Sequence, residues 1–122
     1  MKIGIIGCGN MGQALLKGII AKRYARSNEL LISDKDKRKR RAVYLRFKVG
    51  VASSNSDLVA RSKVIIVAVK PQDLEELAGD IAVPLKGKLV ISICAGITTA
   101  RLQSVFGKIS VVRVMPNMPV VI

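Results

Sequence analysis

The sequence predicts an α/β fold with a doubly wound parallel sheet of about six strands and helices on both faces. Short β-branched, apolar runs alternate with amphipathic segments along the whole chain. The clearest run, residues 64–69, is apolar throughout, which is typical of a strand covered on both faces. The length of 122 residues suits one domain with a core of its own and excludes two.

The predicted strands are short apolar runs that end at glycine or at polar residues. Six such runs occur, over residues 2–6, 29–33, 50–51, 64–69, 89–93 and 110–114. Because a helical pattern lies between most of them, right-handed crossovers should make all six strands parallel.

Five helices are predicted between these strands. In the first, Met11, Leu15 and Ile19 recur at helical spacing, and in the fourth a proline occupies the first turn ahead of several acidic residues. The third begins at polar residues, Asn55 among them, that suit a helix cap. The helices are expected over residues 10–24, 36–47, 55–60, from 71 to about 77, and 98–106.

Composition excludes several kinds of site. The chain has no histidine, so a Ser-His-Asp or Cys-His catalytic set and a histidine metal site are excluded within it. Its two cysteines, Cys8 and Cys94, make neither a disulfide framework nor a zinc site, and we expect no metal. No run reaches the ~20 apolar residues of a membrane span, and no secretory signal precedes the first strand. We therefore expect a cytoplasmic protein without a membrane partner.

The net charge of +13 is concentrated around residues 35–41, with the sequence KDKRKRR. This run is either a solvated helix face or a site for a phosphate-bearing ligand. Nucleic acid is the weakest candidate, because four aromatic residues offer few stacking platforms.

The motif that carries chemistry is G-x-G-x-x-G, at Gly7, Gly9 and Gly12. It follows the first strand and opens the first helix, which is the context of the dinucleotide-binding, Rossmann-type fold. The first glycine allows a tight turn, the second lets a pyrophosphate approach the backbone, and the third lets the helix pack closely on the strand. The sequence therefore predicts binding of NAD(P)H.

The choice between NADPH and NADH depends on the end of the second strand. Asp34 stands where a carboxylate binds the ribose 2′-OH of NADH, unless it only caps the next helix. Lys35, Lys37 and Arg38 follow at once and favour the 2′-phosphate of NADPH. Both cofactors stay open, and the basic side chains favour NADPH.

Other strand ends should line the same crevice. They place Lys70 and Cys94 beside the cofactor and Asn117 on the nicotinamide side. Lys70 is either a cofactor contact or a surface lysine, and Asn117 either a hydrogen-bonding group or a turn residue. The two cysteines are expected to pack as small side chains rather than to act in redox chemistry.

Four segments of the chain together resemble the N-terminal domain of the pyrroline-5-carboxylate reductases. They are IGIIGCGNMG at residues 3–12, AVKP at 68–71, SICAGIT at 92–98 and VRVMPN at 112–117. The resemblance implies reduction of the imine 1-pyrroline-5-carboxylate to L-proline, in proline biosynthesis, with hydride from NADPH or NADH. It also implies that Ser33 and Asn55 contact the cofactor. The complete set of expected cofactor-binding residues is Ile6, Gly7, Cys8, Gly9, Asn10, Met11, Gly12, Ser33, Asp34, Lys35, Asn55, Ala68, Val69, Lys70, Pro71, Cys94, Ala95 and Gly96.

The chain departs from the family in two ways. Met118 replaces the usual threonine, and the 122 residues do not include the helical domain that, in the family, dimerises and supplies most of the substrate pocket. We therefore expect residues 1–122 to be a single cofactor-binding domain, which alone turns over little substrate, while the full-length enzyme is a homo-oligomer. No catalytic residue is assigned.

Two other functions are compatible with the motifs. One is a related NAD(P)-dependent reductase, such as a hydroxyacid dehydrogenase or a deazaflavin-dependent NADP reductase. The other is a non-catalytic nucleotide-sensing or regulatory protein.

Overall fold

The computed structural model describes residues 2–81, 84–94, 96–107 and 109–114. These residues form one six-stranded sheet of order β3-β2-β1-β4-β5-β6, in which every pair of neighbours is parallel. The strands are β1 (Ile3–Ile6), β2 (Leu30–Ser33), β3 (Gly50–Val51), β4 (Val64–Val67), β5 (Leu89–Ser92) and β6 (Ser110–Arg113). The predicted doubly wound sheet is confirmed, and its order reverses between β1 and β4.

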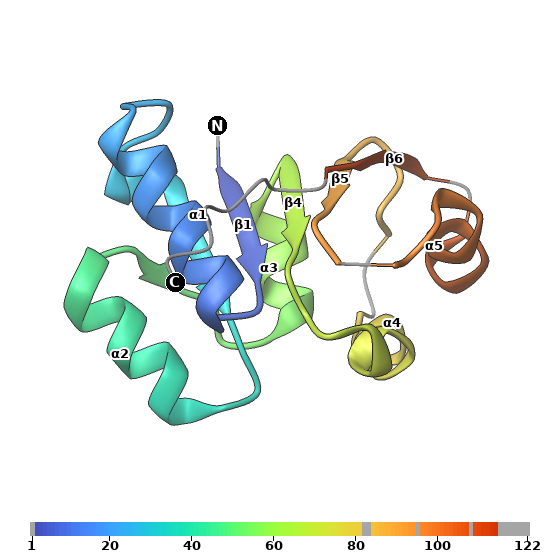
Figure 1. Cartoon of the computed structure of the whole chain (residues 1–122), viewed down its shortest axis with the longest axis horizontal. Helices are drawn as coiled ribbons and strands as arrows, with labels where there is room; N and C mark the ends of the chain where they lie inside the picture. Colours follow the sequence, from blue (N-terminus) through green and yellow to red (C-terminus); the bar gives the residue numbers. More distant parts are fainter. Residues whose placement is uncertain (1, 82–83, 95, 108, 115–122) are drawn as a thin grey trace, which may run out of the picture.

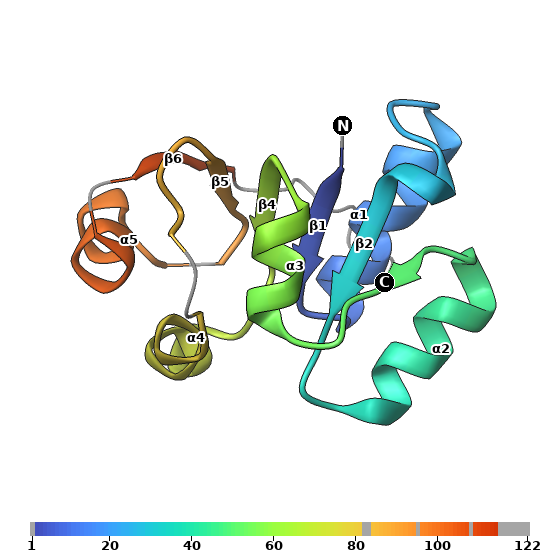
Figure 2. The same ribbon diagram turned by 180° about the vertical axis from the view of Figure 1, so that it is seen from behind.

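Helices cover both faces of the sheet, as predicted. Helices α1 (Asn10–Ala21) and α2 (Lys37–Phe47) pack on one face. The other face carries α3 (Asn55–Arg61), α4 (Leu74–Asp80) and α5 (Thr99–Phe106). Figure 1 shows α1 in front of β1, and the view from behind in Figure 2 shows α3 on the opposite side. None of these described helices is long and apolar enough to cross a bilayer.

The core consists of two apolar layers, one on each side of the sheet. Ile5 pairs with Ile32 on one neighbouring strand and with Ile66 on the other, and all three side chains are buried beneath α1 and α2. The strand residues of opposite phase, such as Leu31 and Ile65, are buried beneath the helices of the other face. Period-two alternation therefore fills both layers, which fixes the register of the strands.

Several predicted boundaries were wrong by a few residues. Helix α1 ends at Ala21 rather than at residue 24, because Arg23 adopts a left-handed conformation with φ 60°. Glu29, predicted in the second strand, belongs to the 3-10 turn η1 (Ser27–Glu29), where its carboxylate accepts a hydrogen bond from the backbone N–H of Arg26.

Two more boundaries differ near the fourth strand and the third helix. Strand β4 ends at Val67 rather than at residue 69, and Pro71 starts the 3-10 turn η2 (Pro71–Asp73) before α4. Helix α3 is capped by Ser54, whose hydroxyl accepts from the N–H of Asp57, and not by the predicted Asn55. Asn55 is thereby left available for other contacts.

Candidate functional site

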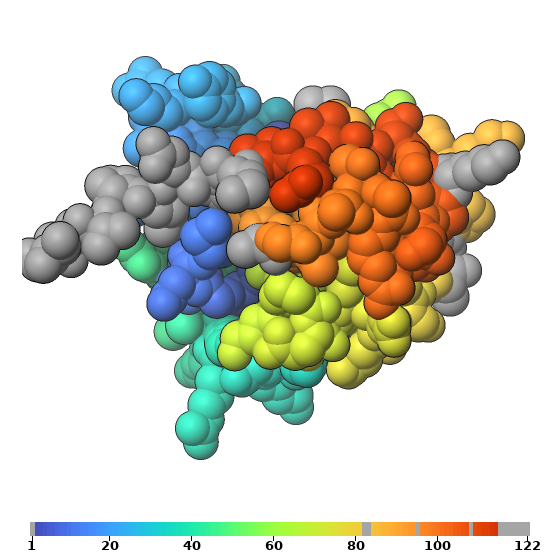
Figure 3. Space-filling model, turned by 45° about the vertical axis from the view of Figure 1, so that its right-hand side comes forward, coloured from blue at the N-terminus to red at the C-terminus, as the bar shows by residue number. Residues whose placement is uncertain are grey.

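A pocket of about 360 Å³ opens beyond the carboxyl ends of β1, β2 and β4. We call it the crevice pocket. It lies where the strand order reverses, the place at which sheets of this kind bind ligands. Figure 3 shows the yellow-green η2–α4 segment next to the teal start of α2 on this side of the molecule. The residues that line the crevice pocket are Ile6, Gly7, Gly9, Asp34, Lys35, Lys39, Asn55, Ala68, Val69, Lys70, Gln72, Asp73, Glu76, Leu77 and Asp80.

The three glycines of the motif have different surroundings. Gly7 has φ +109°, and a Cβ there would lie 2.7 Å from the carbonyl oxygen of Ala68. A Cβ at Gly12 would overlap the carbonyl oxygen of Gly7. By contrast, a Cβ at Gly9 would meet nothing within 4 Å. The first and third glycines thus permit the packing of the fold, whereas the second leaves space at the pocket.

The N-terminus of α1 is open beside Gly9. Gly9 itself is the N-cap, and no side chain caps the helix. Helices α2, α3 and α5, in contrast, each have a side-chain oxygen at the cap, from Asp36, Ser54 and Thr98. Uncapped N–H groups and the helix dipole favour an anion at this position. This arrangement fits a dinucleotide pyrophosphate, because in the described part of the chain no atom beyond the neighbours of Gly9 lies within 4 Å of a Cβ placed on that residue.

Asp34 organises the backbone of the site. One carboxylate oxygen accepts from the N–H of Cys8 at 2.7 Å, and the other accepts from the N–H of Asp36 at 2.8 Å. The alternative that Asp34 caps the basic helix is wrong, because Asp36 does so by accepting from the N–H of Arg38. The Cys8 N–H is therefore occupied by Asp34.

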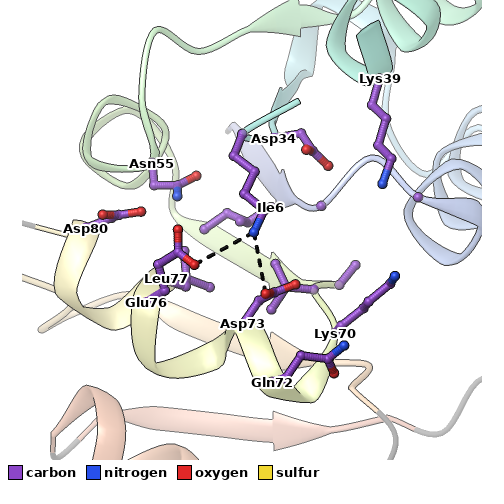
Figure 4. Close-up of a pocket in the computed structure, with 15 residues that line it drawn as sticks. Ile6, Asp34, Lys39, Asn55, Lys70, Gln72, Asp73, Glu76, Leu77 and Asp80 are labelled. Carbon is purple, nitrogen blue, oxygen red and sulfur yellow. Dashed lines mark hydrogen bonds and ion pairs between the residues drawn. The ribbon is translucent and has the colours of Figure 1, made fainter. Parts of the chain in front are cut away.

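Ser33 and Asn55, named by the resemblance, do lie together. The buried Ser33 hydroxyl donates to the Asn55 side-chain oxygen at 2.6 Å. That bond joins the end of β2 to the start of α3 and orients the Asn55 amide at the wall of the crevice pocket (Figure 4). The amide N–H groups of Asn55 can then donate to a ligand.

Lys35 crosses the crevice pocket and pairs with acids on the opposite wall. Its ammonium lies 3.5 Å from Asp73 and 3.7 Å from Glu76, and the dashed lines of Figure 4 end at these two carboxylates. Asp73 and then Glu76 raise the pKa of Lys35. The acidic wall on η2 and α4 was not predicted from the sequence, because there these acids served only as a sign that a helix begins.

A smaller pocket of about 270 Å³ adjoins the crevice pocket. We call it the side pocket. The two share Asp34, Lys35, Asn55 and Asp80. The remaining side-pocket residues are Ser33, Arg40, Ala52 and Ser54. Lys37 and Arg38, expected beside the cofactor, line neither pocket, whereas Lys39 and Arg40 each line one.

About half of the predicted cofactor-binding residues line these pockets. Those that do are Ile6, Gly7, Gly9, Ser33, Asp34, Lys35, Asn55, Ala68, Val69 and Lys70. Those that line neither are Cys8, Asn10, Met11, Gly12, Pro71, Cys94 and Gly96. Met11 instead lines an apolar groove along α1. Ala95, Asn117 and Met118 lie outside the described residues.

Both thiols are buried and unreactive by environment. The Cys8 thiol donates to the Ser33 carbonyl at 3.7 Å, and burial, followed by the nearby Asp34 carboxylate, raises its pKa to about 12. Burial also raises the pKa of Cys94, whose thiol contacts the Val69 carbonyl at 3.1 Å. These contacts agree with packing roles rather than with thiolate chemistry.

We expect the folded protein to resist thiol alkylation. With a pKa of about 12, only about one Cys8 thiol in ten thousand is ionised at pH 8. Iodoacetamide labelling followed by mass spectrometry should be slow in buffer and fast in urea at the same pH. Equal labelling rates in both conditions would contradict the buried placement of the two thiols.

Comparison with known proteins identifies the family to which the chain belongs. Residues 2–96 match the model of the family described as NADP oxidoreductase, coenzyme F420-dependent. The pyrroline-5-carboxylate reductase of Haemophilus influenzae is 36% identical over 122 residues, which cover 98% of this chain and 44% of that protein. The Escherichia coli enzyme of the same name is 34% identical over 123 residues, covering 99% of this chain and 46% of that one. The chain thus spans less than half the length of these relatives.

Solved structures agree in fold and sequence. A Plasmodium falciparum pyrroline carboxylate reductase with NADP bound superposes with a TM-score of 0.83 at 31% identity, over 96% of this chain and 42% of that one. A pyrroline-5-carboxylate reductase from Coxiella burnetii gives a TM-score of 0.81 at 31% identity, over 97% of this chain and 44% of that one. The resemblance seen in the motifs is confirmed. The chain belongs to the family described as NADP oxidoreductase, coenzyme F420-dependent.

Proposed function

We propose that this chain is the NADPH-binding part of a pyrroline-5-carboxylate reductase, with NADH as the second possible cofactor. The observation that carries the proposal is the open N-terminus of α1 beside Gly9. No side chain caps the helix there, and apart from the chain neighbours of Gly9 no atom of the described residues lies within 4 Å of a Cβ placed on it. The named relatives, two of them 31% identical solved structures, support the imine substrate and the product L-proline.

Each part of the crevice pocket has a role in this proposal. The first-turn N–H groups of α1 bind the pyrophosphate. Asp34 holds the loop before this helix in place by accepting a hydrogen bond from the N–H of Cys8. Asn55, oriented by Ser33, donates to the adenosine ribose, and the chain from Ala68 to Lys70 forms the opposite wall. When bound, the dinucleotide supplies the hydride. Because an iminium carbon is already electrophilic, the protein acts mainly by positioning and by exclusion of water.

The rest of the reaction is proposed for the complete protein. Asn117 is proposed to face the substrate. A region equivalent to the part of the relatives that these 122 residues do not span is proposed to complete the substrate pocket and to form a homo-oligomer. A cytoplasmic location is consistent with two buried, unpaired thiols.

Two measurements test the proposal. The 122-residue chain, titrated with NADPH by calorimetry, should show saturable binding. The product of the complete reading frame should oxidise NADPH only when 1-pyrroline-5-carboxylate is present, and the 122 residues alone at least about tenfold more slowly, because an incompletely positioned substrate reacts slowly. Binding without turnover by the complete product would favour a nucleotide-sensing protein, and absence of binding would refute the proposal.

A further inference from the structure

Arg40 differs from the other cations of the basic run. It lies in the first turn of α2, where its N–H donates to the Asp36 carbonyl. With Val43 and Phe47 it occupies the stripe that faces the sheet. Consequently Arg40 is partly buried, whereas every other cation between residues 35 and 41 is exposed.

The guanidinium of Arg40 has no acidic partner in the described part of the chain: no carboxylate oxygen there lies within 4 Å. Asp34, which lines the same pocket as Arg40, uses both carboxylate oxygens to accept from backbone N–H groups. Lys35, in contrast, is paired with two acids. A partly buried cation without a counter-charge favours binding of an anion, which compensates its desolvation.

The side pocket offers suitable partners for that anion. Arg40 lines the side pocket together with Ser54 and Asn55, whose hydroxyl and amide N–H groups can donate hydrogen bonds to phosphate oxygens. The Ser33 hydroxyl, also in this lining, already donates to Asn55. Asp34 and Asp80 also line it and oppose an anion, so the unpaired guanidinium must offset them. Because the side pocket and the crevice pocket share Asp34, Lys35, Asn55 and Asp80, they are adjacent, and one extended ligand can contact both.

In sheets of this topology the 2′ position of a bound dinucleotide lies just after the second strand. We infer that Arg40 is the residue that selects NADPH over NADH, by binding the 2′-phosphate in the side pocket. This inference rests on the proposed function and replaces the expectation that Lys35, Lys37 and Arg38 have this role. Lys35 lines both pockets but is paired with two acids. Lys37 and Arg38 are exposed and line neither pocket.

The test compares three variants with the unaltered chain. Dissociation constants for NADPH and NADH are measured by calorimetry for Arg40→Gln, Arg40→Lys and the control Lys37→Gln, which removes a cation from the same helical turn. Arg40→Gln should weaken NADPH binding at least about tenfold, the value of a charge-assisted hydrogen bond, and leave NADH within about twofold. Arg40→Lys should retain part of the preference, and Lys37→Gln all of it.

The outcomes separate the two proposals. If the unaltered chain binds neither dinucleotide, the proposed function fails. If it binds both and Arg40→Gln weakens them equally or not at all, the inference about Arg40 fails while the proposed function stands. Circular dichroism melting curves must coincide for the variants. A selective loss of NADPH affinity that diminishes in high salt would support the assignment, because added ions screen a partly exposed phosphate contact.

Discussion

Replacement of Gly9 by valine is expected to abolish NADPH binding and to leave the fold intact. The backbone of Gly9 is extended, with φ −75° and ψ −168°, a conformation that β-branched residues adopt readily. Apart from the chain neighbours of Gly9, no atom of the described residues lies within 4 Å of a Cβ at this position, so the Cβ of the new side chain causes no steric overlap there. It does fill the space in front of the uncapped α1 N-terminus, where we place the pyrophosphate.

Calorimetry with NADPH and urea denaturation together check this prediction. Binding should become undetectable, while the free energy of unfolding falls by no more than about 1 kcal/mol, the difference between glycine and valine as cap residues. Gly18→Ala is the matched control, because Gly18 lies in the same helix and a Cβ there also meets nothing within 4 Å. That variant should bind normally and be slightly more stable, since alanine favours the helix. Unchanged NADPH affinity in Gly9→Val would place the pyrophosphate elsewhere.

The sequence was sufficient for the sheet and for the glycine loop. Fully apolar strands such as β4 required burial on both faces, and the spacing of Gly7, Gly9 and Gly12 required a strand–turn–helix junction. Both signals involve residues that are close together in the sequence, and for that reason they could be recognised without a structure. The element boundaries that were wrong depended on single backbone conformations, such as the left-handed Arg23.

The parts of the site that were missed depend on contacts between distant segments. Lys35 pairs with Asp73, which lies 38 residues further on, and this pairing follows from the placement of η2 beside the β2–α2 turn. Asp34 contacts the Cys8 N–H because β1 and β2 end at the same level, with Ile6 opposite Ser33. The partial burial of Arg40 could have been predicted, because its spacing to Val43 and Phe47 places it on the same buried face of the helix.

Gly12→Ala is expected to destabilise the fold itself, in contrast to Gly9→Val. A Cβ at Gly12 would overlap the carbonyl oxygen of Gly7, and the backbone at Gly7 has little freedom to move away. The Gly7 N–H donates to the Ser33 carbonyl at 2.9 Å. The Gly7 Cα packs so closely on Ala68 that a Cβ built on it would lie only 2.7 Å from the Ala68 carbonyl oxygen. Relief of the overlap therefore requires α1 to separate from the junction of β1, β2 and β4.

Urea denaturation of Gly12→Ala should show a free energy of unfolding lower by about 3 kcal/mol or more, at the upper end of overpacking effects, because backbone rather than a flexible side chain is displaced. Gly18→Ala introduces the same methyl group into the same helix where nothing obstructs it, so it separates this steric effect from helix propensity. NADPH binding by Gly12→Ala should also be lost, but as a consequence of the displaced loop. A variant as stable as the unaltered chain would mean that α1 does not pack on the Gly7 carbonyl. In that case the open helix N-terminus would not be held at the crevice pocket by this contact.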